Sequence, residues 1–519
     1  MSLATAILPA DPDELRAFAA LLQSELYAKT LHIEKLKAQL AALRRARFGQ
    51  SSEKLDRQIE QLELMIGDLE EGEAENEARA AATTVARSPA RTPREGNRKP
   101  LPGHLPREII QHPGACVCPA CGSQRLRKID DDSREVLEYV PSHFKVVVHV
   151  RPKLSCRDCE AITQPPMPAL PIERGRPGAG LVAHVIISKY CDHTPLNRQS
   201  DIYAREGVDL DRSTMAGWVG KMAWLLTPLS QAIGDYARAG PSAHADDTPI
   251  PVLDPGSGKT KKGQLWVVVR DEKPWGSPNP QAAYYHYSPN RKGEHAHALL
   301  KPCRGYLHAD GYTGFGKLYE PDAAGETMLL EVACWAHARR GIFEDHAKTK
   351  SAIAMNALEK IGALFAIERE INGQNPDIRL ATRQARSVPL LAELKAFMET
   401  NLNRISKKSE LATAFRYCLK RWTALTRFTL DGRLEMSNNA AERAIRPLTL
   451  GRRNWTFLGS DTGGTRAAVF YTIIQSAKLY GLNPEAYLTD IIQRIADHPA
   501  KHIDQLLPWN WTPKSPPGL

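Results

Sequence analysis

Two Cys-x-x-Cys pairs constrain the fold of this chain more than any other feature of its sequence. Cys118 and Cys121 form the first pair, Cys156 and Cys159 form the second, and 34 residues lie between Cys121 and Cys156. Four thiolates from two such turns make the tetrahedral sulfur cage that structural zinc prefers. We therefore predict one structural zinc ion that is bound by these four cysteines.

The residues between the two pairs are predicted to form a β-hairpin. Arg134–Val140 and Phe144–Leu154 are rich in strand-forming residues, and Pro-Ser-His joins them. This hairpin would hold the two cysteine turns together, which predicts a zinc-binding ribbon over residues 108–165. Cys116 is a further cysteine close to the first pair, so the choice of ligands stays open on this side.

The size and charge of the chain indicate its class. With 519 residues, 42% of them hydrophobic, the chain has enough material for two to four domains. Lys and Arg number 69 against 59 Asp and Glu, and the net charge of +10 favours a polyanionic partner such as nucleic acid. No run of 18 apolar residues occurs and the N-terminus has no basic leader, so we expect a cytoplasmic protein without a membrane anchor.

The N-terminal region carries a leucine repeat. Asp13–Phe48 has the pattern of one helix with apolar residues three and four apart, and a second helix follows residues 49–52. The repeat predicts a dimeric coiled coil over residues 1–71, although an antiparallel helical pair within one chain fits the same spacing. Residues 72–107 lose the repeat and are rich in Ala, Glu, Thr, Arg and Pro, which predicts a flexible linker.

Three helical patterns follow the ribbon, within residues 166–238. They cover Leu181–Cys191, Leu196–Glu206 and Ser213–Leu226, and a short turn that begins at Gly207 joins the last two. This layout is typical of a helix-turn-helix, so we predict a DNA-binding module here. Two helices joined by a glycine turn also occur in ordinary helical domains, and that alternative stays open.

The order of strands and helices from residue 239 onward predicts the catalytic fold. Strands are expected at Ser242–Val252, Gln264–Arg270, Ala282–Tyr287, Gly305–Ala309 and Thr327–Ala333, with a helix at Glu294–Leu300. This is the order of the ribonuclease-H-like fold, so we predict an α+β multidomain protein whose catalytic core begins at residues 239–345. Asp246 on the first strand and Asp310 at the end of the fourth occupy the places where that fold holds acidic residues side by side.

A pair of divalent ions needs a third carboxylate. Glu442 follows a Ser-Asn-Asn capping sequence and falls in an early turn of a helix. Mg²⁺ prefers carboxylate oxygens, and two such ions stabilise both the attacking and the leaving oxygen of a phosphoryl transfer. We therefore predict that Asp246, Asp310 and Glu442 bind two Mg²⁺ or Mn²⁺ ions. Asp247 competes with Asp246 for this role, and Glu435 competes with Glu442.

The segments around Glu442 complete the predicted domain plan. Residues 346–430 are mostly helical and are predicted to be an insertion into the core, which resumes at 431–480 and is followed by a helical segment at 481–519. The basic and aromatic candidates for DNA contact are Arg443, Arg446, Arg452, Arg453 and Trp455. Core packing explains Trp455 equally well. No Walker sequence is present and Gly463-Gly464 is predicted to be a turn, so we expect no dependence on ATP.

Further motifs join these in one order along nearly the whole chain. They include Arg47-Phe48-Gly49-x-Ser51-Ser52, Lys189-Tyr190, Pro195-Leu196-x-Arg198-Gln199, His244-x-Asp246-x-Thr248-Pro249, Asp310-Gly311-Tyr312, Cys334-Trp335-Ala336-His337, Asn438-Asn439-x-x-Glu442-Arg443 and Gly451-Arg452-Arg453-Asn454-Trp455. In this order, together with the paired Cys-x-x-Cys module, the chain closely resembles the insertion-sequence-sixty-six-type (TnpC-like) DDE transposases of bacterial mobile elements.

The resemblance implies a recombinase in which Asp246, Asp310 and Glu442 are catalytic. Such enzymes nick the ends of their element with metal-activated water, and the freed 3′-hydroxyls then attack target DNA. The resemblance also implies DNA as the partner, a homodimer, and small accessory proteins encoded by the same element in a bacterial cytoplasm. Cys334 and His337 match a Cys-x-x-His signature of several DDE families, for which an ordering role, a DNA contact and simple packing are all open.

Two other functions fit the same motifs. A catalytically decayed copy would be a DNA-binding regulator, and it would bind element ends without Mg²⁺-dependent cleavage. A metal-dependent nuclease or resolvase would cut DNA without joining the 3′-hydroxyl ends to a target.

Overall fold

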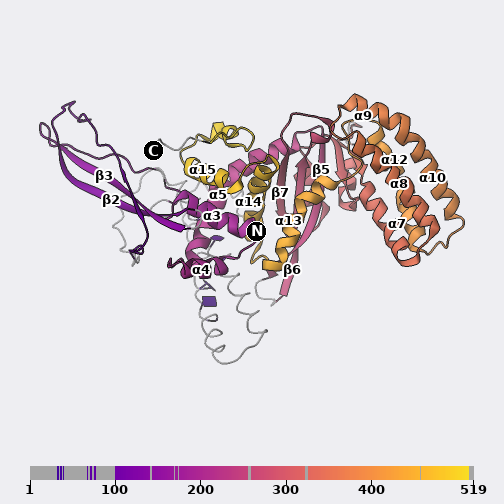
Figure 1. The fold of residues 1–519 in the computed structure, drawn as a ribbon, viewed down its shortest axis with the longest axis horizontal. Coiled ribbons are helices and arrows are strands. Elements are labelled where there is room, and N and C mark those ends of the chain that lie inside the picture. Colours follow the sequence, from indigo (N-terminus) through magenta and orange to yellow (C-terminus); the bar gives the residue numbers. More distant parts are fainter. Residues whose placement is uncertain are drawn as a thin grey trace, which may run out of the picture.

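The computed structural model describes ten helical residues of the N-terminal region (32, 33, 36, 37, 39, 67, 71, 72, 75 and 76) and residues 100–140, 143–168, 170–172, 175–254, 259–321, 325–455 and 457–513. Figure 1 shows three parts in a row, namely a long β-hairpin, a helix-covered sheet and a group of helices. The described part is a mixed α/β structure, as predicted.

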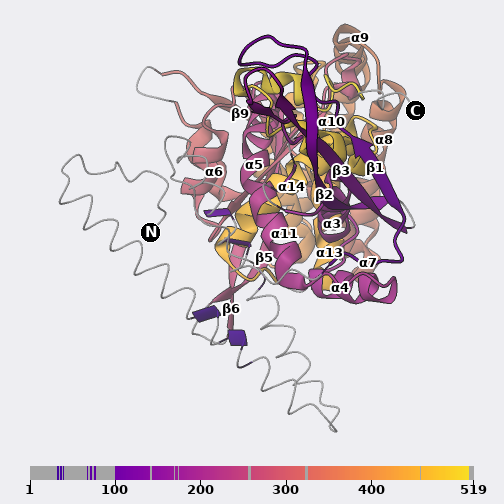
Figure 2. The same cartoon turned by 90° about the vertical axis from the view of Figure 1, so that its left-hand side faces the viewer.

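The zinc-ribbon region is a four-stranded sheet built on a long hairpin. β2 (Leu126–Val140) pairs antiparallel with β3 (His143–Cys156), β1 (Arg107–Gln111) pairs parallel with β3, and β4 (Ile162–Thr163) pairs antiparallel with β3. Figure 2 looks at the molecule from the hairpin end and shows β1, β2 and β3 side by side. Both predicted strands are present, but β2 begins earlier than predicted. The backbone of β3 offers partners as far as Cys156, and this pairing overrides the low strand propensity of the Asp-rich residues 130–132.

A five-stranded mixed sheet forms the middle of the molecule. Its strands are β5 (Ser242–Asp254), β6 (Lys259–Arg270), β7 (Ala282–Ser288), β8 (Gly305–Ala309) and β9 (Leu329–Ala333), in the order β7-β6-β5-β8-β9. β5, β6 and β7 pair antiparallel, whereas β8 pairs parallel with β5 and β9 pairs parallel with β8. The five predicted strands are present, and the predicted helix between the third and fourth is α6 (Gly293–Leu300).

Helices cover both faces of this sheet. Successive side chains of a strand point to opposite faces, and apolar side chains lie on both of them. On β6, Val267 and Val269 are buried against α5 (Arg212–Arg238) and α14 (Asp461–Leu479), while Trp266 and Val268 lie in the cluster that includes α6. α13 (Asn439–Trp455) packs over β5 and β6. The sheet is therefore the middle layer of three.

The helices before the sheet correct one prediction. They are α3 (Ala179–Tyr190), α4 (Leu196–Arg205) and α5, which continues well past its predicted end at Leu226. α5 packs against β6, β7 and α14, and Met215, Val219 and Met222 are at most 1% exposed. The predicted helix-turn-helix stays a prediction, because one face of α5 packs on the core while Arg212, Ser213 and Thr214 at its start are exposed or partly exposed.

The third part is a helical unit with a hydrophobic core of its own. Its helices are α7 (Trp335–Thr349), α8 (Ala352–Glu370), α9 (Pro376–Thr382), α10 (Val388–Leu402), α11 (Glu410–Lys420) and α12 (Trp422–Thr426), with a π-helical turn at Arg383–Ser387. Short 3-10 helices lie at Lys273–Trp275, Thr313–Tyr319, Arg427–Thr429 and Ala500–Leu506. The helical unit begins with α7 and not at residue 346, because α7 packs against α8 and α11.

Segments from both ends of the chain pack on the middle part. α15 (Pro484–Arg494) lies against α3, where Nδ1 of His184 is 3.0 Å from Oε1 of Glu485. Glu71 is 1% exposed and its carboxylate pairs with Arg466 on α14 and with Lys189 on α3. Residues 71, 72, 75 and 76 are helical, so helix continues into the segment predicted to be a linker from residue 72.

Most of the predicted coiled coil and of the predicted linker lies outside the described residues. Ile33 and Leu36, which belong to the leucine repeat, are helical and buried. Among the described helices, none is both long enough and apolar enough to span a bilayer.

Gly463 and Gly464 lie inside α14, so the prediction of a turn at this pair is wrong. α14 packs closely on β7, and this contact depends on the missing side chain. A Cβ atom at Gly464 would lie 2.4 Å from Cδ2 of Tyr287.

We expect Gly464→Ala to lower the free energy of unfolding by about 1–3 kcal/mol, because the new methyl group overlaps the Tyr287 ring. Gly362→Ala on α8 is the matched control, since no described atom beyond its own helix backbone comes within 4 Å of a Cβ built there. Alanine is favoured over glycine in helices by up to about 1 kcal/mol, so this control should be neutral or stabilising. Thermal unfolding measures both, and a wild-type melting temperature for Gly464→Ala would contradict the packing.

Candidate active site and metal site

The three predicted catalytic carboxylates come from three separate elements. Asp246 is on β5, Asp310 directly follows β8, and Glu442 is in the first turn of α13. β5 and β8 are parallel neighbours with His244 opposite His308. Asp246 and Asp310 each stand two residues further on, so both side chains point to the sheet face that α13 covers. The structure thus brings these three side chains to one face of the sheet.

The negative charges of these groups act on one another. Burial raises the pKa of Asp246 to about 7, and the charges of Asp310, Asp247 and Glu442 contribute to the increase. A hydrogen bond of 2.8 Å from the backbone N–H of Asp247 opposes it. A divalent cation would relieve this repulsion and restore the ionised form of Asp246. Carboxylate oxygens are the ligands that a hard ion such as Mg²⁺ prefers.

The helical unit holds the turn that carries Asp310. Oδ1 of Asp310 accepts the backbone N–H of Tyr312 at 2.9 Å, and its carbonyl oxygen accepts the hydroxyl of Tyr417 on α11 at 3.1 Å. Nη2 of Arg421 donates to the carbonyl of Gly311 at 2.9 Å. Gly311 has a φ of +89°, a left-handed conformation that favours glycine. The position of the second carboxylate therefore depends partly on α11 and the residue after it.

A buried network connects both strands to the loop before α13. The rings of His244 and His308 stack with centroids 4.1 Å apart, and Nε2 of His308 accepts a backbone N–H of that loop at 3.0 Å. Oδ1 of Asn438 lies 3.3 Å from Nδ1 of His244, while its Nδ2 donates to the carbonyl of Ala245 at 2.8 Å. Burial lowers the pKa of His244 to about 4 and that of His308 well below its usual value, so both rings are neutral at pH 7.

The two competing carboxylates have arginine partners. Nε and Nη2 of Arg291 donate to the carboxylate of Asp247 at 2.6 and 2.9 Å. Glu435 pairs with Arg379, whose side chain is 1% exposed. An arginine thus neutralises each of these two carboxylates without a metal ion. The geometry therefore does not favour Asp247 over Asp246, or Glu435 over Glu442, as a metal ligand.

The predicted DNA-contact residues follow α13. Arg443 and Arg446 are exposed, and Nη2 of Arg443 lies 3.3 Å from Oδ2 of the buried Asp271. Trp455 is partly buried and packs against the catalytic core, which favours packing over stacking on bases. The side chains of Arg452 and Arg453 are outside the described part of the structure.

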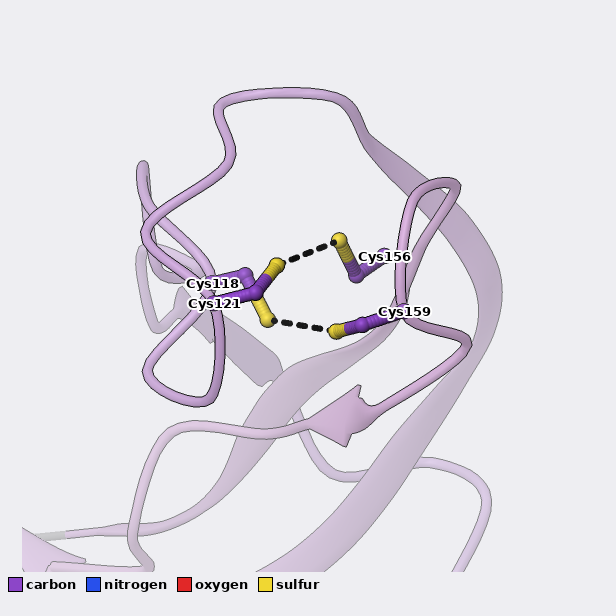
Figure 3. Close-up of side chains that lie close together, drawn as sticks. All are labelled: Cys118, Cys121, Cys156 and Cys159. Atoms are coloured by element: carbon purple, nitrogen blue, oxygen red, sulfur yellow. Dashed lines mark hydrogen bonds between the residues drawn. The ribbon is translucent and has the colours of Figure 1, made fainter.

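The four predicted zinc ligands meet where the hairpin ends (Figure 3). Sγ of Cys118 lies 3.4 Å from Sγ of Cys159, and Sγ of Cys121 lies 3.6 Å from Sγ of Cys156. All four sulfur atoms lie within 4.8 Å of one another. Zinc–sulfur bonds of about 2.3 Å separate tetrahedral ligands by roughly 3.8 Å, so the cage fits zinc. Cys116 is exposed and outside this group, and the geometry favours the other four cysteines.

Sequence analysis missed four residues of this site. They are the stacked His244 and His308, and Tyr417 and Arg421, which hold the Asp310 turn. One signal was available for the histidines, because the tripeptide His-Ala-Asp occurs at residues 244–246 and again at 308–310. On two parallel neighbouring strands this repeat puts both residue types in register. Tyr417 and Arg421 carry no such signal, since their contacts depend on how the helical unit folds back on the sheet.

Four known family models match successive segments of this chain. The family described as "Transposase IS66 family" matches residues 174–466, which include the sheet and the helical unit. "Transposase C of IS166 homeodomain" matches 35–110, "zinc-finger binding domain of transposase IS66" matches 115–160, and "IS66 C-terminal element" matches 472–509.

Curated relatives from Sinorhizobium fredii are similar over most of the chain. Uncharacterized protein y4hP is 40% identical over 495 residues, which is 92% of this chain and 88% of that protein. Uncharacterized protein y4qI is 35% identical over 543 residues, which is 99% of each chain. The similarity therefore extends over the ribbon, the sheet and the helical unit.

Replacement of one cage cysteine should release the ribbon metal. We expect Cys118→Ser to lose one tightly bound equivalent of zinc, because three thiolates bind it less strongly than four. Cys116→Ser is the matched control and should keep that equivalent, since Cys116 lies outside the cage. Metal analysis after dialysis against a weak chelator measures zinc per chain. Zinc lost from Cys116→Ser but kept by Cys118→Ser would reassign the first ligand.

Asn438→Ala should destabilise the chain by about 1–3 kcal/mol, because it leaves buried polar groups of His244 and Ala245 without their partner. Asn401→Ala on α10 is a matched control, since it removes a single bond to the carbonyl of Phe397 within the same helix. Urea unfolding at fixed zinc concentration compares the two variants. If Asn438→Ala costs no more than Asn401→Ala, the network does not tie the strands to the loop.

Proposed function

Because this chain belongs to the IS66 transposase family, we propose that it cleaves and joins DNA at the ends of a bacterial insertion sequence. One observation supports the proposal, namely that the elements that carry Asp246, Asp310 and Glu442 place them on one face of the sheet. Burial raises the pKa of Asp246 to about 7, and the nearby charges of Asp310 and Glu442 add to the increase. Such a cluster is suited to hold divalent ions against the phosphates of DNA.

The strand order supports a ribonuclease-H-like core for this chemistry. Three antiparallel strands, β5 to β7, are followed by α6 and by two parallel strands on the other side of β5. The helical unit is inserted between β9 and α13, so the third carboxylate returns to the sheet from a distant part of the chain. In this arrangement one carboxylate lies on the first strand and one at the end of the fourth.

Asp246, Asp310 and Glu442 would hold two Mg²⁺ or Mn²⁺ ions. Such a pair, when bound, activates the attacking hydroxyl and stabilises the leaving oxygen of a phosphodiester. The contribution of the protein is to hold these carboxylates in position. The His244–His308 stack and Asn438 fix the spacing between the strands and the helix of Glu442.

The DNA backbone would follow the exposed side of α13. Arg443 and Arg446 are exposed there, next to the carboxylates, and Arg452 and Arg453 extend the same basic sequence. Arginine binds phosphate through paired hydrogen bonds, and several such contacts make binding dependent on salt. These residues would hold the strand in place while Trp455 packs against the core.

The reaction consists of two exchanges of P–O bonds. In the first, water attacks the phosphodiester at an element end and frees a 3′-hydroxyl. In the second, that hydroxyl attacks a phosphodiester of target DNA, and one strand end is joined as another leaves. Since each step breaks one P–O bond and forms one, no ATP is needed.

The remaining parts would assemble this reaction on DNA. We propose that the N-terminal helices form a homodimer, so that two element ends are handled together, and that the ribbon holds one structural zinc ion. Small accessory proteins of the same element are proposed partners. The site of action would be the bacterial cytoplasm, where the DNA lies.

Strand transfer of a labelled, pre-nicked element end into plasmid DNA tests the proposal. We expect the wild type to join the end in Mg²⁺ and Glu442→Gln to bind it without joining, with a loss on the order of 10³-fold. Glutamine keeps the size of the side chain but removes the charge that holds the ion, and such an ion stabilises the transition state by several kcal/mol.

Glu410→Gln is the matched control for this experiment. Glu410 is an exposed residue on α11 that pairs with Lys348, so its loss should leave joining unchanged. Equal joining by the wild type and Glu442→Gln would remove Glu442 from the site. The same assay with an intact element end reports cleavage. Cleavage of that end without joining by the wild type would indicate a nuclease, and end binding without cleavage, in Mn²⁺ as well, would indicate a regulator.

A further inference from the structure

Three side chains of mixed chemistry meet beside the proposed Mg²⁺ cluster. Cys334 immediately precedes α7, His337 is in the first turn of α7, and Glu442 is in the first turn of α13. One sulfur, one imidazole nitrogen and one carboxylate oxygen from these residues lie within 4.8 Å of one another. Cys334 is 1% exposed, so this thiol is not a surface group.

Two of these atoms are buried without a hydrogen bond. Nδ1 of His337 lies 3.3 Å from Oε1 of Glu442, yet within the described part of the chain neither atom makes a hydrogen bond. Buried polar atoms in native proteins almost always have a partner, and leaving one without a partner costs free energy. A cation between the nitrogen and the oxygen would satisfy both.

The turn around Cys334 has the backbone geometry of the zinc-ribbon turns. The sulfur of Cys334 accepts the backbone N–H groups of the residues two and three further on, Ala336 and His337. Cys118 and Cys156 in the ribbon each accept the N–H groups at the same two positions. A further N–H, that of Asn438, lies 3.1 Å from the Cys334 sulfur. Burial raises the pKa of the Cys334 thiol, and these N–H groups oppose that increase by stabilising the thiolate, the form that binds a metal.

The donor set selects the kind of ion. Mg²⁺ prefers oxygen ligands, whereas thiolate and imidazole suit Zn²⁺ and similar transition metals. We propose that Cys334, His337 and Glu442 form a second metal site of this chain, for a zinc-class ion that connects the beginning of α7 to the beginning of α13. Zinc sites with three protein ligands leave the fourth position to water or substrate.

The proposed site and the proposed reaction share one residue. Glu442 has two carboxylate oxygens, so it could bridge the zinc-class ion and an ion held with Asp246 and Asp310. The inference rests on the proposed function only through this residue. Its test is a binding measurement without DNA, and the two proposals can therefore fail separately.

Cobalt binding to the full-length chain tests the second site. The ribbon cage is first filled with one equivalent of Zn²⁺, and Co²⁺ is then added while the thiolate-to-cobalt absorption band is recorded. We expect one further equivalent of Co²⁺ to bind with this band, and the band to be lost in Cys334→Ser. His337→Ala should weaken cobalt binding at least tenfold, because it removes one of three protein ligands.

Cys418→Ser is the matched control, since Cys418 is also buried, lies in the same helical unit and belongs to neither metal cluster of the described residues. It should keep the band. Far-ultraviolet circular dichroism confirms that each variant is folded before titration. A band that persists in Cys334→Ser, or a wild type that binds no cobalt beyond the ribbon equivalent, would overturn the proposal.

Discussion

The parallel pairing of β5 with β8 sets the position of every other group in the candidate active site. His244 stands opposite His308 in this pairing, so the two aspartates that follow share a face of the sheet. A shift of either strand by one residue would turn its aspartate toward α6 instead. The stacked rings then bind the loop that leads to α13, so a single strand register determines where all three carboxylates meet.

The helical unit contributes to the same geometry through two buried arginines. Arg379 and Arg383 are 1% and 0% exposed, and both donate to backbone carbonyls of the loop before α13, including that of Leu434. Glu368 compensates the charge of Arg383 with two hydrogen bonds of 2.8 and 2.6 Å. Together with Tyr417 and Arg421 at the Asp310 turn, these contacts make the inserted helices a support for two of the three carboxylates.

Most of what the sequence predicted well depends on local pattern. The five strands of the sheet follow from alternation and turn residues, and the cage cysteines follow from their spacing. The errors have a common cause in tertiary contacts. The helix that was predicted to end at Leu226 continues to Arg238, because α5 packs against β6, β7 and α14. The pair Gly463-Gly464 has the composition of a turn, but it lies inside α14, where the ring of Tyr287 occupies the space of a side chain at residue 464. Arg379 and Tyr417 could not be assigned roles because their partners are far away in the sequence.

The hairpin that carries the cysteine cage extends well beyond the core of the molecule. Leu137 and Phe144 anchor the hairpin in the core, whereas the residues from Leu126 to Ser133 extend beyond this base and most of them are exposed. Eight residues of strand measure about 27 Å, so a rotation of about 10° at the base would move the cysteine cage by about 5 Å. A small rotation where β2 meets α3 would therefore be magnified at the cysteine cage.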